Sequence, residues 1–261
     1  MKKISNYLAS LVLLFIFIAT TSFIPAKRMY YLIKVYQLRS QEQVSAMDNY
    51  LSTAYLPALH RAGYSNIGIF YPAVPDTSKE TKLYVFIPIG NLHKLSQVED
   101  LPLTDPVLRE AGTAFWDAAY DAPPYQRMEN IVIQAFPLMP KYELPQLTDL
   151  KENHIYELRS YEGPTERLYR QKVKMFNEGG EISLFKRLNF NAVFYGEVVA
   201  GSKMPNLMYM TSFNNMADRD AHWKTFRDDA QWISIKDLPE YLHTVSKNDQ
   251  LLLRAKSYSD F

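Results

Sequence analysis

The sequence contains no cysteine. It therefore has no disulfide framework, no thiolate metal site, no cysteine nucleophile and no lipoprotein-type cysteine acceptor. Long basic runs are missing as well: the 261 residues hold 29 Lys+Arg against 28 Asp+Glu, without a cluster of the kind that neutralises phosphates. Nucleic acid is therefore not an expected partner. Hydrophobic residues make up 47% of the chain, so its stability can come from a buried core.

Motifs for metal and phosphate binding are also missing. No pair of the five histidines has an HxH, HxxH or HExxH spacing, so no local cluster of metal ligands forms. The sequence has no Gly-rich phosphate loop, no G-x-S-x-G elbow and no EF-hand pattern. We therefore expect neither a metal nor a cofactor.

The N-terminus has the pattern of a secretory signal peptide. Lys2 and Lys3 form a positive start, an apolar run covers residues 8–18, and small or polar residues follow at 19–22. These features predict a signal peptide over residues 1–26 and a periplasmic or secreted protein. The alternative is an uncleaved membrane anchor, because residues 8–24 approach the minimum spanning length of roughly 17 residues.

A hexapeptide occurs twice, as VYQLRS at Val35–Ser40 and as IYELRS at Ile155–Ser160. Each copy opens a stretch with the same order of expected elements, so the chain is read as two modules of about 110 residues, within the usual domain range. The first, degenerate module covers 29–137 and the second covers 154–261. A proline-rich linker, 138–153, separates them.

Periodicity and turn residues predict similar elements in both modules. In the first they are strands at 30–40, 66–71, 82–89 and 130–136, a helix at 42–62 kinked at Pro57, and an Ala-rich helix around 106–120. In the second they are strands at 155–161, 192–198, 207–213 and 249–256, helices at 165–177 and 181–188, and an amphipathic helix at 218–232.

Strand–helix–strand–strand–helix–strand is the split βαβ, ferredoxin-like unit. The expected fold class is thus α+β, with two tandem ferredoxin-like modules forming an intrachain pseudo-dimeric α/β barrel. Strand alternation then predicts the faces of the repeat. Tyr156 and Leu158 should meet the helices. The opposite face, which carries Glu157, Arg159 and Tyr161 in the second module and Gln37 and Arg39 in the first, should meet the opposing sheet.

Five segments of the second module resemble the NIPSNAP family. They are IYELRSYEGP at 155–164, MFNEGGEI at 175–182, VFYGE at 193–197, MPNLMYM at 204–210, and the helix with Arg219, Trp223, Phe226, Asp229 and Trp232. The resemblance is dense across 155–261 and looser across 30–140. It implies membership of the dimeric α/β-barrel superfamily, which agrees with the fold expected from the residues.

What the resemblance implies for function is limited. NIPSNAP proteins have no settled enzymatic activity, and the eukaryotic members are known mainly as mitochondrial, membrane-associated interaction proteins. Related barrel families include cofactor-free monooxygenases, small-molecule isomerases and haem-binding enzymes. This chain has Ala230-Gln231-Trp232 where the family often has Pro-Glu-Trp. In the first module the nearest echoes of the Arg/Trp helix are Arg109 and Trp116, which argues against a site symmetric between the modules.

The segment from Asn177 to Glu181 is one candidate site. Its two glycines end one helix, and Glu181 falls in the first turn of the next. The loop could present Glu178 and Glu181 to a cavity as acid, base or binding groups, or it could simply be a break between helices with a charged first turn.

A second candidate group surrounds Glu157 and Arg159. A polar pocket could use Arg159 as a bidentate donor to a carboxylate or enolate, and Tyr209 could join it. The plainer alternative is a ladder of charges that pairs these residues with Arg254 or Glu197. On the amphipathic helix, His222 beside Trp223 could be an axial haem ligand as in some related barrels, or an ordinary solvated histidine.

The leading functional hypothesis is an exported NIPSNAP-type protein that binds a small apolar or aromatic molecule inside the barrel. The Tyr-, Phe- and Met-rich strands with a few convergent polar groups have the profile of a ligand pocket. One alternative is a non-enzymatic module whose exposed helix aromatics dock a protein or the envelope surface. Another is a cofactor-free oxygenase or isomerase using Glu181, Arg159 and Tyr209. Whether the protein is an enzyme, and whether it is a monomer or a homodimer, stays open at this point.

Overall fold

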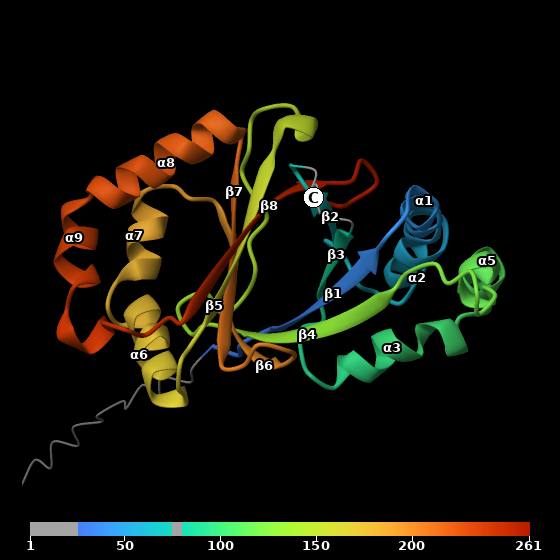
Figure 1. The fold of residues 1–261 in the computed structure, drawn as a ribbon, viewed down its shortest axis with the longest axis horizontal. Coiled ribbons are helices and arrows are strands. Elements are labelled where there is room, and N and C mark those ends of the chain that lie inside the picture. Colours follow the sequence, from blue (N-terminus) through green and yellow to red (C-terminus); the bar gives the residue numbers. More distant parts are fainter. Residues whose placement is uncertain (1–25, 75–79) are drawn as a thin grey trace, which may run out of the picture.

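The computed structural model describes residues 26–74 and 80–261, which form eight strands and a set of surrounding helices (Figure 1). All but the last residue of the predicted signal peptide, 1–26, lies outside the described residues. In the part that is described, no helix is both long and apolar enough to cross a membrane.

The first module contains four strands and five α-helices. They are β1 (Tyr30–Leu38), α1 (Gln41–Tyr50), α2 (Leu56–Arg61), β2 (Gly68–Pro72), β3 (Thr81–Pro88), α3 (Lys94–Thr104), α4 (Pro106–Ala111), α5 (Thr113–Trp116) and β4 (Arg127–Ala135). The expected kink at Pro57 takes the form of a π-helical turn, Leu51–Tyr55, directly before α2. A widened turn accommodates the ring and the missing N–H of a proline.

The second module has the same order of strands and helices. Its elements are β5 (Ile155–Glu162), α6 (Glu166–Asn177), α7 (Glu181–Arg187), β6 (Ala192–Ala200), β7 (Asn206–Phe213), α8 (Met216–Asp228), α9 (Ala230–Lys236) and β8 (Lys247–Ala255). Thr165 caps α6 by accepting the N–H of Leu168, as expected from the sequence. Asp229 caps α9, so the single helix expected over 218–232 is two helices that meet at this residue.

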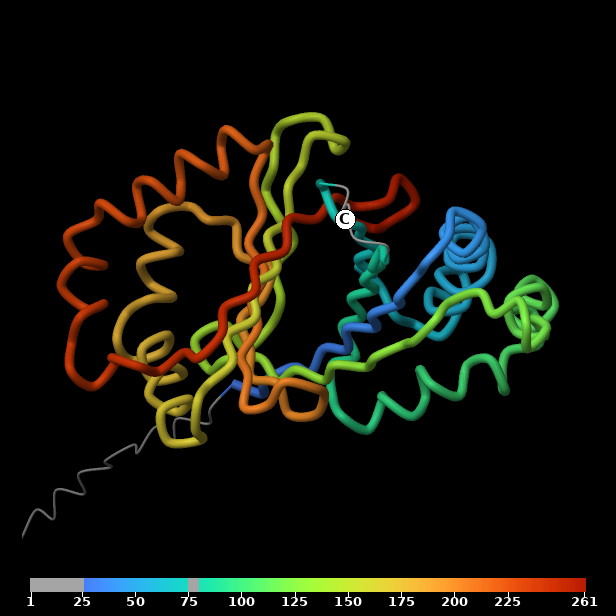
Figure 2. Tube along the Cα trace, in the orientation of Figure 1, coloured from blue at the N-terminus to red at the C-terminus, as the bar shows by residue number. Residues whose placement is uncertain are grey.

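The eight strands close into one barrel in the order β1-β3-β2-β8-β5-β7-β6-β4. Each module contributes one antiparallel sheet, and the two sheets join edge to edge at two seams. At one seam β2 pairs with β8, and at the other β4 pairs with β6. The helices of the two modules lie on opposite outer sides of this barrel (Figures 1 and 2). The expected fold class, a pseudo-dimeric barrel within one chain, is confirmed.

Aromatic side chains from both modules pack inside the barrel. The rings of Phe86 and Phe194 stack with centroids 5.2 Å apart, and Tyr31 lies 5.4 Å from each of them. Phe70 of the first module and Tyr156 of the second also pack together, with ring centroids 4.9 Å apart. The shared interior therefore holds a hydrophobic core that joins the modules.

The expected faces of β5 are wrong. Tyr156 and Leu158 belong to the core inside the barrel, whereas Glu157, Arg159 and Tyr161 face the helices of the second module. In the first module Gln37 shares the side of β1 that carries Ile33 and Val35, which pack inside. Arg39 lies beyond the end of β1, is exposed and pairs with Glu80.

The apolar side of β5 faces inward because the interior of the barrel is itself a hydrophobic core. The register of the repeat explains why Gln37 and Glu157, which the hexapeptides align, lie on opposite faces of their strands. The two hexapeptides begin 120 positions apart, at Val35 and Ile155, but the strands that contain them begin 125 positions apart, at Tyr30 and Ile155. The helix caps, Ser40 and Thr165, are also 125 positions apart. The difference of five is odd, and an odd shift moves every side chain of a strand to its other face. The structural repeat is thus YLIKVY at 31–36 with YELRSY at 156–161.

Candidate functional site

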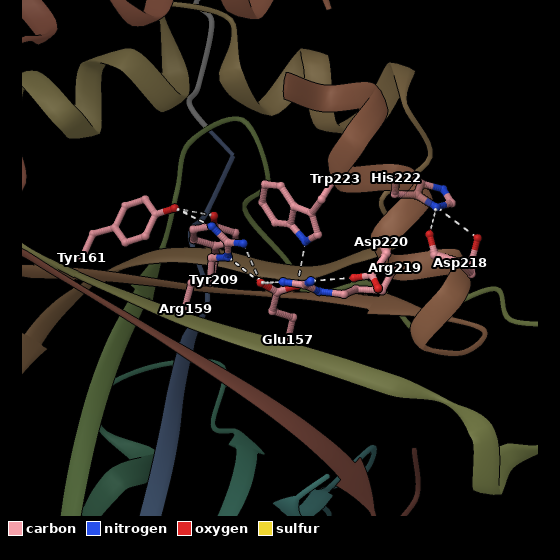
Figure 3. Close-up of polar contacts among 9 residues, drawn as sticks. All are labelled: Glu157, Arg159, Tyr161, Tyr209, Asp218, Arg219, Asp220, His222 and Trp223. Carbon is pink, nitrogen blue, oxygen red and sulfur yellow. Dashed lines mark hydrogen bonds and ion pairs between the residues drawn. The ribbon is translucent and has the colours of Figure 1, made fainter. Parts of the chain in front are cut away.

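Glu157 lies at the centre of a polar network on the outer face of β5, beneath α8 (Figure 3). The carboxylate is fully buried. Its Oε1 accepts from Arg159 Nε at 2.7 Å and from Arg219 Nη2 at 3.1 Å, while its Oε2 accepts from Arg219 Nε at 2.8 Å and from Trp223 Nε1 at 2.6 Å. Both oxygens are therefore satisfied by charge-assisted or indole donors.

This environment fixes the ionisation of Glu157. Burial by itself would raise the pKa of the carboxyl, but the hydrogen bond from Arg219 and the charges of Arg159 and Arg219 outweigh it and hold the pKa below its ordinary value. The same pairing raises the pKa of Arg219. An ionised carboxylate with every lone pair engaged is a poor general base, so Glu157 positions other side chains.

Arg159 connects this carboxylate to two tyrosines. Its guanidinium stacks 3.7 Å above the ring of Trp223, and its Nη1 donates to the Tyr161 hydroxyl at 3.2 Å. The hydroxyls of Tyr161 and Tyr209 lie 2.9 Å apart. Burial raises the pKa of Tyr209 well above its ordinary value. Tyr209 therefore keeps its proton and can act as a hydrogen-bond donor.

A second buried ion pair lies beside this network. Lys172 on α6 contacts Glu181 Oε2 at 2.8 Å, and both residues are almost completely buried. Gly180 has a φ of 94°, which lets the chain turn sharply so that Glu181 begins α7. A β-carbon at Gly179 would lie 2.8 Å from the Tyr241 hydroxyl. The close packing around this turn thus requires the two glycines, and the turn also positions the carboxylate of Glu181.

These groups surround a cavity of about 520 Å³ between the sheet and helices of the second module. Its size is within the range of about 300–1,000 Å³ that is usual for small-molecule sites. The lining residues are Arg159, Tyr161, Lys172, Glu181, Tyr209, Arg219, Trp223, Phe226, Arg227, Trp232, Asn248 and Gln250. This candidate cavity lies on the outer face of the sheet, whereas the ligand site was expected inside the barrel.

The cavity is basic and aromatic. Four cationic side chains line it, while the carboxylates at hand are Glu181 in the lining, Glu157 directly behind it and Asp220, which pairs with Arg219, so a formal excess of one positive charge remains. The rings of Trp223, Phe226 and Trp232 form one wall. This combination favours a flat molecule that carries negative charge.

The structure brings four of the predicted site residues to the cavity, namely Arg159, Glu181, Tyr209 and Trp223. Four others lie outside its lining, and of these Glu157 lies directly behind it. Asn177 donates to the carbonyl of Val173 at the end of α6, and Glu178 is exposed. His222 contacts the carbonyl and carboxylate of Asp218, away from the cavity (Figure 3).

The alternative charge ladder is wrong in its partners. Glu197 pairs with Arg28 and Arg170, and Arg254 donates to the carbonyl of Glu152. The true partners of Glu157 and Arg159 come from α8, because the charged side of β5 faces the helices. In the part of the chain that the structure describes, no group of three His, Asp or Glu residues is arranged to hold a metal ion.

Sequence reasoning assigned no role to three residues that line the cavity, namely Arg219, Lys172 and Trp232. Arg219 and Trp232 stood in the NIPSNAP-like helix without an assigned role, and Lys172 was not singled out. A signal for Lys172 exists: it lies at helical spacing from Tyr169 and Phe176, which are buried. A lysine on the apolar side of a helix should indicate a buried partner.

Comparison with known proteins gives a family match in the second module. The NIPSNAP family model matches residues 156–260, which include β5 from its second residue, α6 to α9 and β8. The second module thus matches the NIPSNAP family model over almost its whole length. All twelve lining residues of the cavity lie inside it. No curated protein matches the chain.

Solved structures share the fold. A protein from Fusobacterium nucleatum with a proposed monooxygenase activity has a TM-score of 0.55 at 8% identity, covering 88% of this chain and 93% of its own. An anthrone oxidase-like protein has a TM-score of 0.51 at 8% identity, covering 89% and 93%. A NIPSNAP family protein from Agrobacterium tumefaciens is 18% identical, with a TM-score of 0.37, 41% of this chain covered and 96% of its own. The first two show that the entire barrel, and not the NIPSNAP domain alone, is a known arrangement.

Proposed function

We propose that this NIPSNAP-domain protein binds a small, flat aromatic anion in the cavity lined by Arg159, Lys172 and Trp223. The observation that carries the proposal is the excess of positive charge on a largely aromatic lining. Arg159 and Arg219 share the single carboxylate of Glu157, and an anionic ligand would add counter-charge at the cavity. The aromatic wall supplies stacking area for a ring system.

The tyrosine pair gives the cavity a directed donor. Arg159 donates to the oxygen of Tyr161, so the Tyr161 hydroxyl can donate to Tyr209, whose own proton is then available to a ligand. Because the pKa of Tyr209 is raised by burial, this proton stays in place at neutral pH. A carboxylate, phenolate or enolate oxygen is the acceptor that such a donor favours.

Binding is tested with 2-naphthoate as the probe and 2-naphthamide as its neutral counterpart. Isothermal titration should give tighter binding of the carboxylate, and Arg227→Gln should weaken it about two- to fivefold, the effect of one partly exposed charge. Lys224→Gln, also on α8 but paired with Asp228 at the surface, is the matched control and should bind normally. Equal affinities for both probes would overturn the proposal.

A cofactor-free oxygenation is the second candidate function, favoured by the position of Glu181. Its contact with Lys172 runs through Oε2, and it lies in the same lining as Tyr209. Glu181 could remove a proton from a carbon acid while Tyr209 stabilises the enolate. With anthrone the balanced reaction consumes one O₂: the substrate loses two hydrogens and gains one oxygen atom, giving anthraquinone, and the second oxygen atom leaves as water.

Oxygen uptake with anthrone tests this second candidate. Glu181→Gln should reduce the rate about a hundredfold or more, as expected for loss of a general base. Glu178→Gln, an exposed neighbour outside the cavity, should leave the rate unchanged. No enzyme-dependent uptake, or equal rates in both variants, would exclude oxygenation and leave the binding proposal intact.

The interaction-module alternative has less support in the second module. Trp223 and Phe226 of α8 are buried against the core and not displayed for docking.

We also propose export through residues 1–26. Fractionation of the native host followed by mass spectrometry should find a mature protein that lacks this segment in the periplasm or medium. Cytoplasmic protein with the segment retained would contradict export.

A further inference from the structure

The first module contains a cavity that corresponds to the one in the NIPSNAP domain. It measures about 210 Å³ and lies between the outer face of β1 and β4 and the helices of the first module. Its lining residues are Lys34, Tyr36, Tyr50, Tyr55, Val98, Glu99, Pro102, Phe115, Trp116, Tyr125 and Met128. None of them belongs to the second-module cavity.

The two cavities are related by the spacing of the structural repeat. Four residue pairs, each 125 positions apart, line the first and second cavity respectively: Lys34 with Arg159, Tyr36 with Tyr161, Val98 with Trp223, and Pro102 with Arg227. The strand start and the helix cap show the same spacing. A cation followed two residues later by a tyrosine thus occupies the same place in both modules. The structural repeat therefore has a cavity at the same position in both modules, but with different chemistry.

The changed chemistry is that of a neutral site. Lys34 is buried and paired with Glu99, so the charges of the cavity balance. Val98 and Pro102 stand where the NIPSNAP domain has Trp223 and Arg227. Tyr50 stacks on Phe115 with ring centroids 3.7 Å apart and planes 4° from parallel, and Tyr36 and Tyr125 add further rings.

One tyrosine that lines this cavity has a hydroxyl without a partner among the residues that the structure describes. Tyr55 is 3% exposed, and its hydroxyl, buried itself, has no hydrogen-bond partner among the residues that the structure describes. A buried donor left without an acceptor costs about 1–3 kcal/mol. A ligand oxygen within reach would relieve this cost. The volume also fits a single ring with a short substituent, because roughly 150 Å³ is enough for benzene.

We propose that the first-module cavity is a second ligand site that binds a neutral, single-ring aromatic molecule with a hydrogen-bond acceptor. The aromatic lining holds the ring, the Lys34–Glu99 pair leaves no net charge to attract an anion, and Tyr55 donates to the acceptor. The site is independent of the anion site of the NIPSNAP domain, since the two share no residue.

The three tryptophans of the chain report on the two sites separately. Trp116 lines the first-module cavity, whereas Trp223 and Trp232 line the other. Protein labelled with 5-fluorotryptophan gives one ¹⁹F signal for each, and Trp116→Phe assigns the first. Acetophenone, a neutral ring with a carbonyl acceptor, should shift the Trp116 signal in a saturable way and leave the other two in place.

Two comparisons then test the role of Tyr55. Tyr55→Phe should weaken acetophenone about fivefold, the effect of one neutral hydrogen bond. Ethylbenzene, which has the ring but no acceptor, should bind both proteins equally. Tyr64→Phe is the matched control, a buried tyrosine of the same core that does not line the cavity. An unmoved Trp116 signal, equal binding of acetophenone and ethylbenzene, or unchanged affinity in Tyr55→Phe would each overturn the proposal.

Discussion

Arg159 and Trp223 contact each other face to face, with the guanidinium carbon 3.7 Å from the ring centroid. Both residues also donate to the same carboxylate, Glu157. Arg159 thus contacts the face of the indole ring, and Glu157 accepts a hydrogen bond from its N–H at the edge. Held in this way, Arg159 and Trp223 both line the cavity. Precise placement of the cavity wall therefore depends on a residue, Glu157, that does not itself line the cavity.

Trp223→Phe separates these two contacts, because phenylalanine keeps an aromatic face but has no N–H donor. We expect the free energy of unfolding to fall by about 1–3 kcal/mol, since a buried carboxylate loses one of its donors. Urea unfolding measures the change. Trp232→Phe is the control: this ring lines the same cavity and packs 4.6 Å from Phe226. A larger loss in the control than in Trp223→Phe would contradict the importance of the indole hydrogen bond.

The depressed pKa of Glu157 makes stability depend on acid pH. In the unfolded chain a glutamate has a pKa of about 4.3, and in the folded protein the pKa of Glu157 is lower. The unfolded state therefore takes up the proton first as the pH falls. The stabilisation from this group is complete above the unfolded pKa and is lost as the pH falls through the folded pKa.

Glu157→Gln tests this dependence. The free energy of unfolding at pH 7 should fall by about 3–5 kcal/mol, because the buried Arg159 loses its counter-charge and the partly buried Arg219 loses one of its two. Below about pH 4.3 the difference between wild type and variant should shrink. Denaturant titrations at a series of pH values measure both effects. A difference that stays constant down to pH 2 would show that Glu157 is not the titrating group.

The element order and the barrel were predictable because they depend on local signals. Capping by Thr165, the glycines at 179 and 180 and the strand patterns all act within a few residues. The α3 helix, Lys94–Thr104, was not among the expected elements; its last turn contains Pro102, which removes only one hydrogen bond there.

The faces of β5 were not predictable from the hexapeptide. The matching letters suggested a spacing of 120, while the spacing of 125 is set by strand pairing and by the distance from strand to cap. The predicted location of the site was affected in the same way. Arg159, Glu181, Tyr209 and Trp223, all nominated as candidate site residues, do line one cavity, but that cavity lies outside the barrel. Which side of a strand a charge occupies depends on the register, and the register is a property of the assembled sheet.

The buried pair of Lys172 and Glu181 should show strong coupling. Lys172→Met leaves an uncompensated buried carboxylate, and Glu181→Gln leaves an uncompensated ammonium, so each should destabilise the protein by about 3 kcal/mol or more. The double variant should lose much less than the sum, because both charges are removed together. Urea unfolding of the four proteins gives the coupling energy. Additive losses would show that the two side chains do not stabilise each other.

Gly196 tests the closure of the barrel. It lies on β6 at the seam with β4, opposite Ala135, and a β-carbon there would come within 2.6 Å of the Gln134 carbonyl oxygen and 2.4 Å of an Ile133 methyl group. The Gln134 carbonyl belongs to the backbone of β4, so it cannot move away without separating β4 from β6. Gly196→Ala should therefore lower the free energy of unfolding by about 1–3 kcal/mol, the usual cost of overpacking.

The seam itself can be followed by amide hydrogen exchange. In Gly196→Ala, protection should fall in β4 and β6 more than in β5 and β7, because the latter pair lies within one module. Val199→Thr, an exposed change on the same strand, should leave exchange and stability within about 0.5 kcal/mol of wild type. Unchanged protection at β4 and β6 in Gly196→Ala would mean that the two modules do not depend on this seam for their closed arrangement.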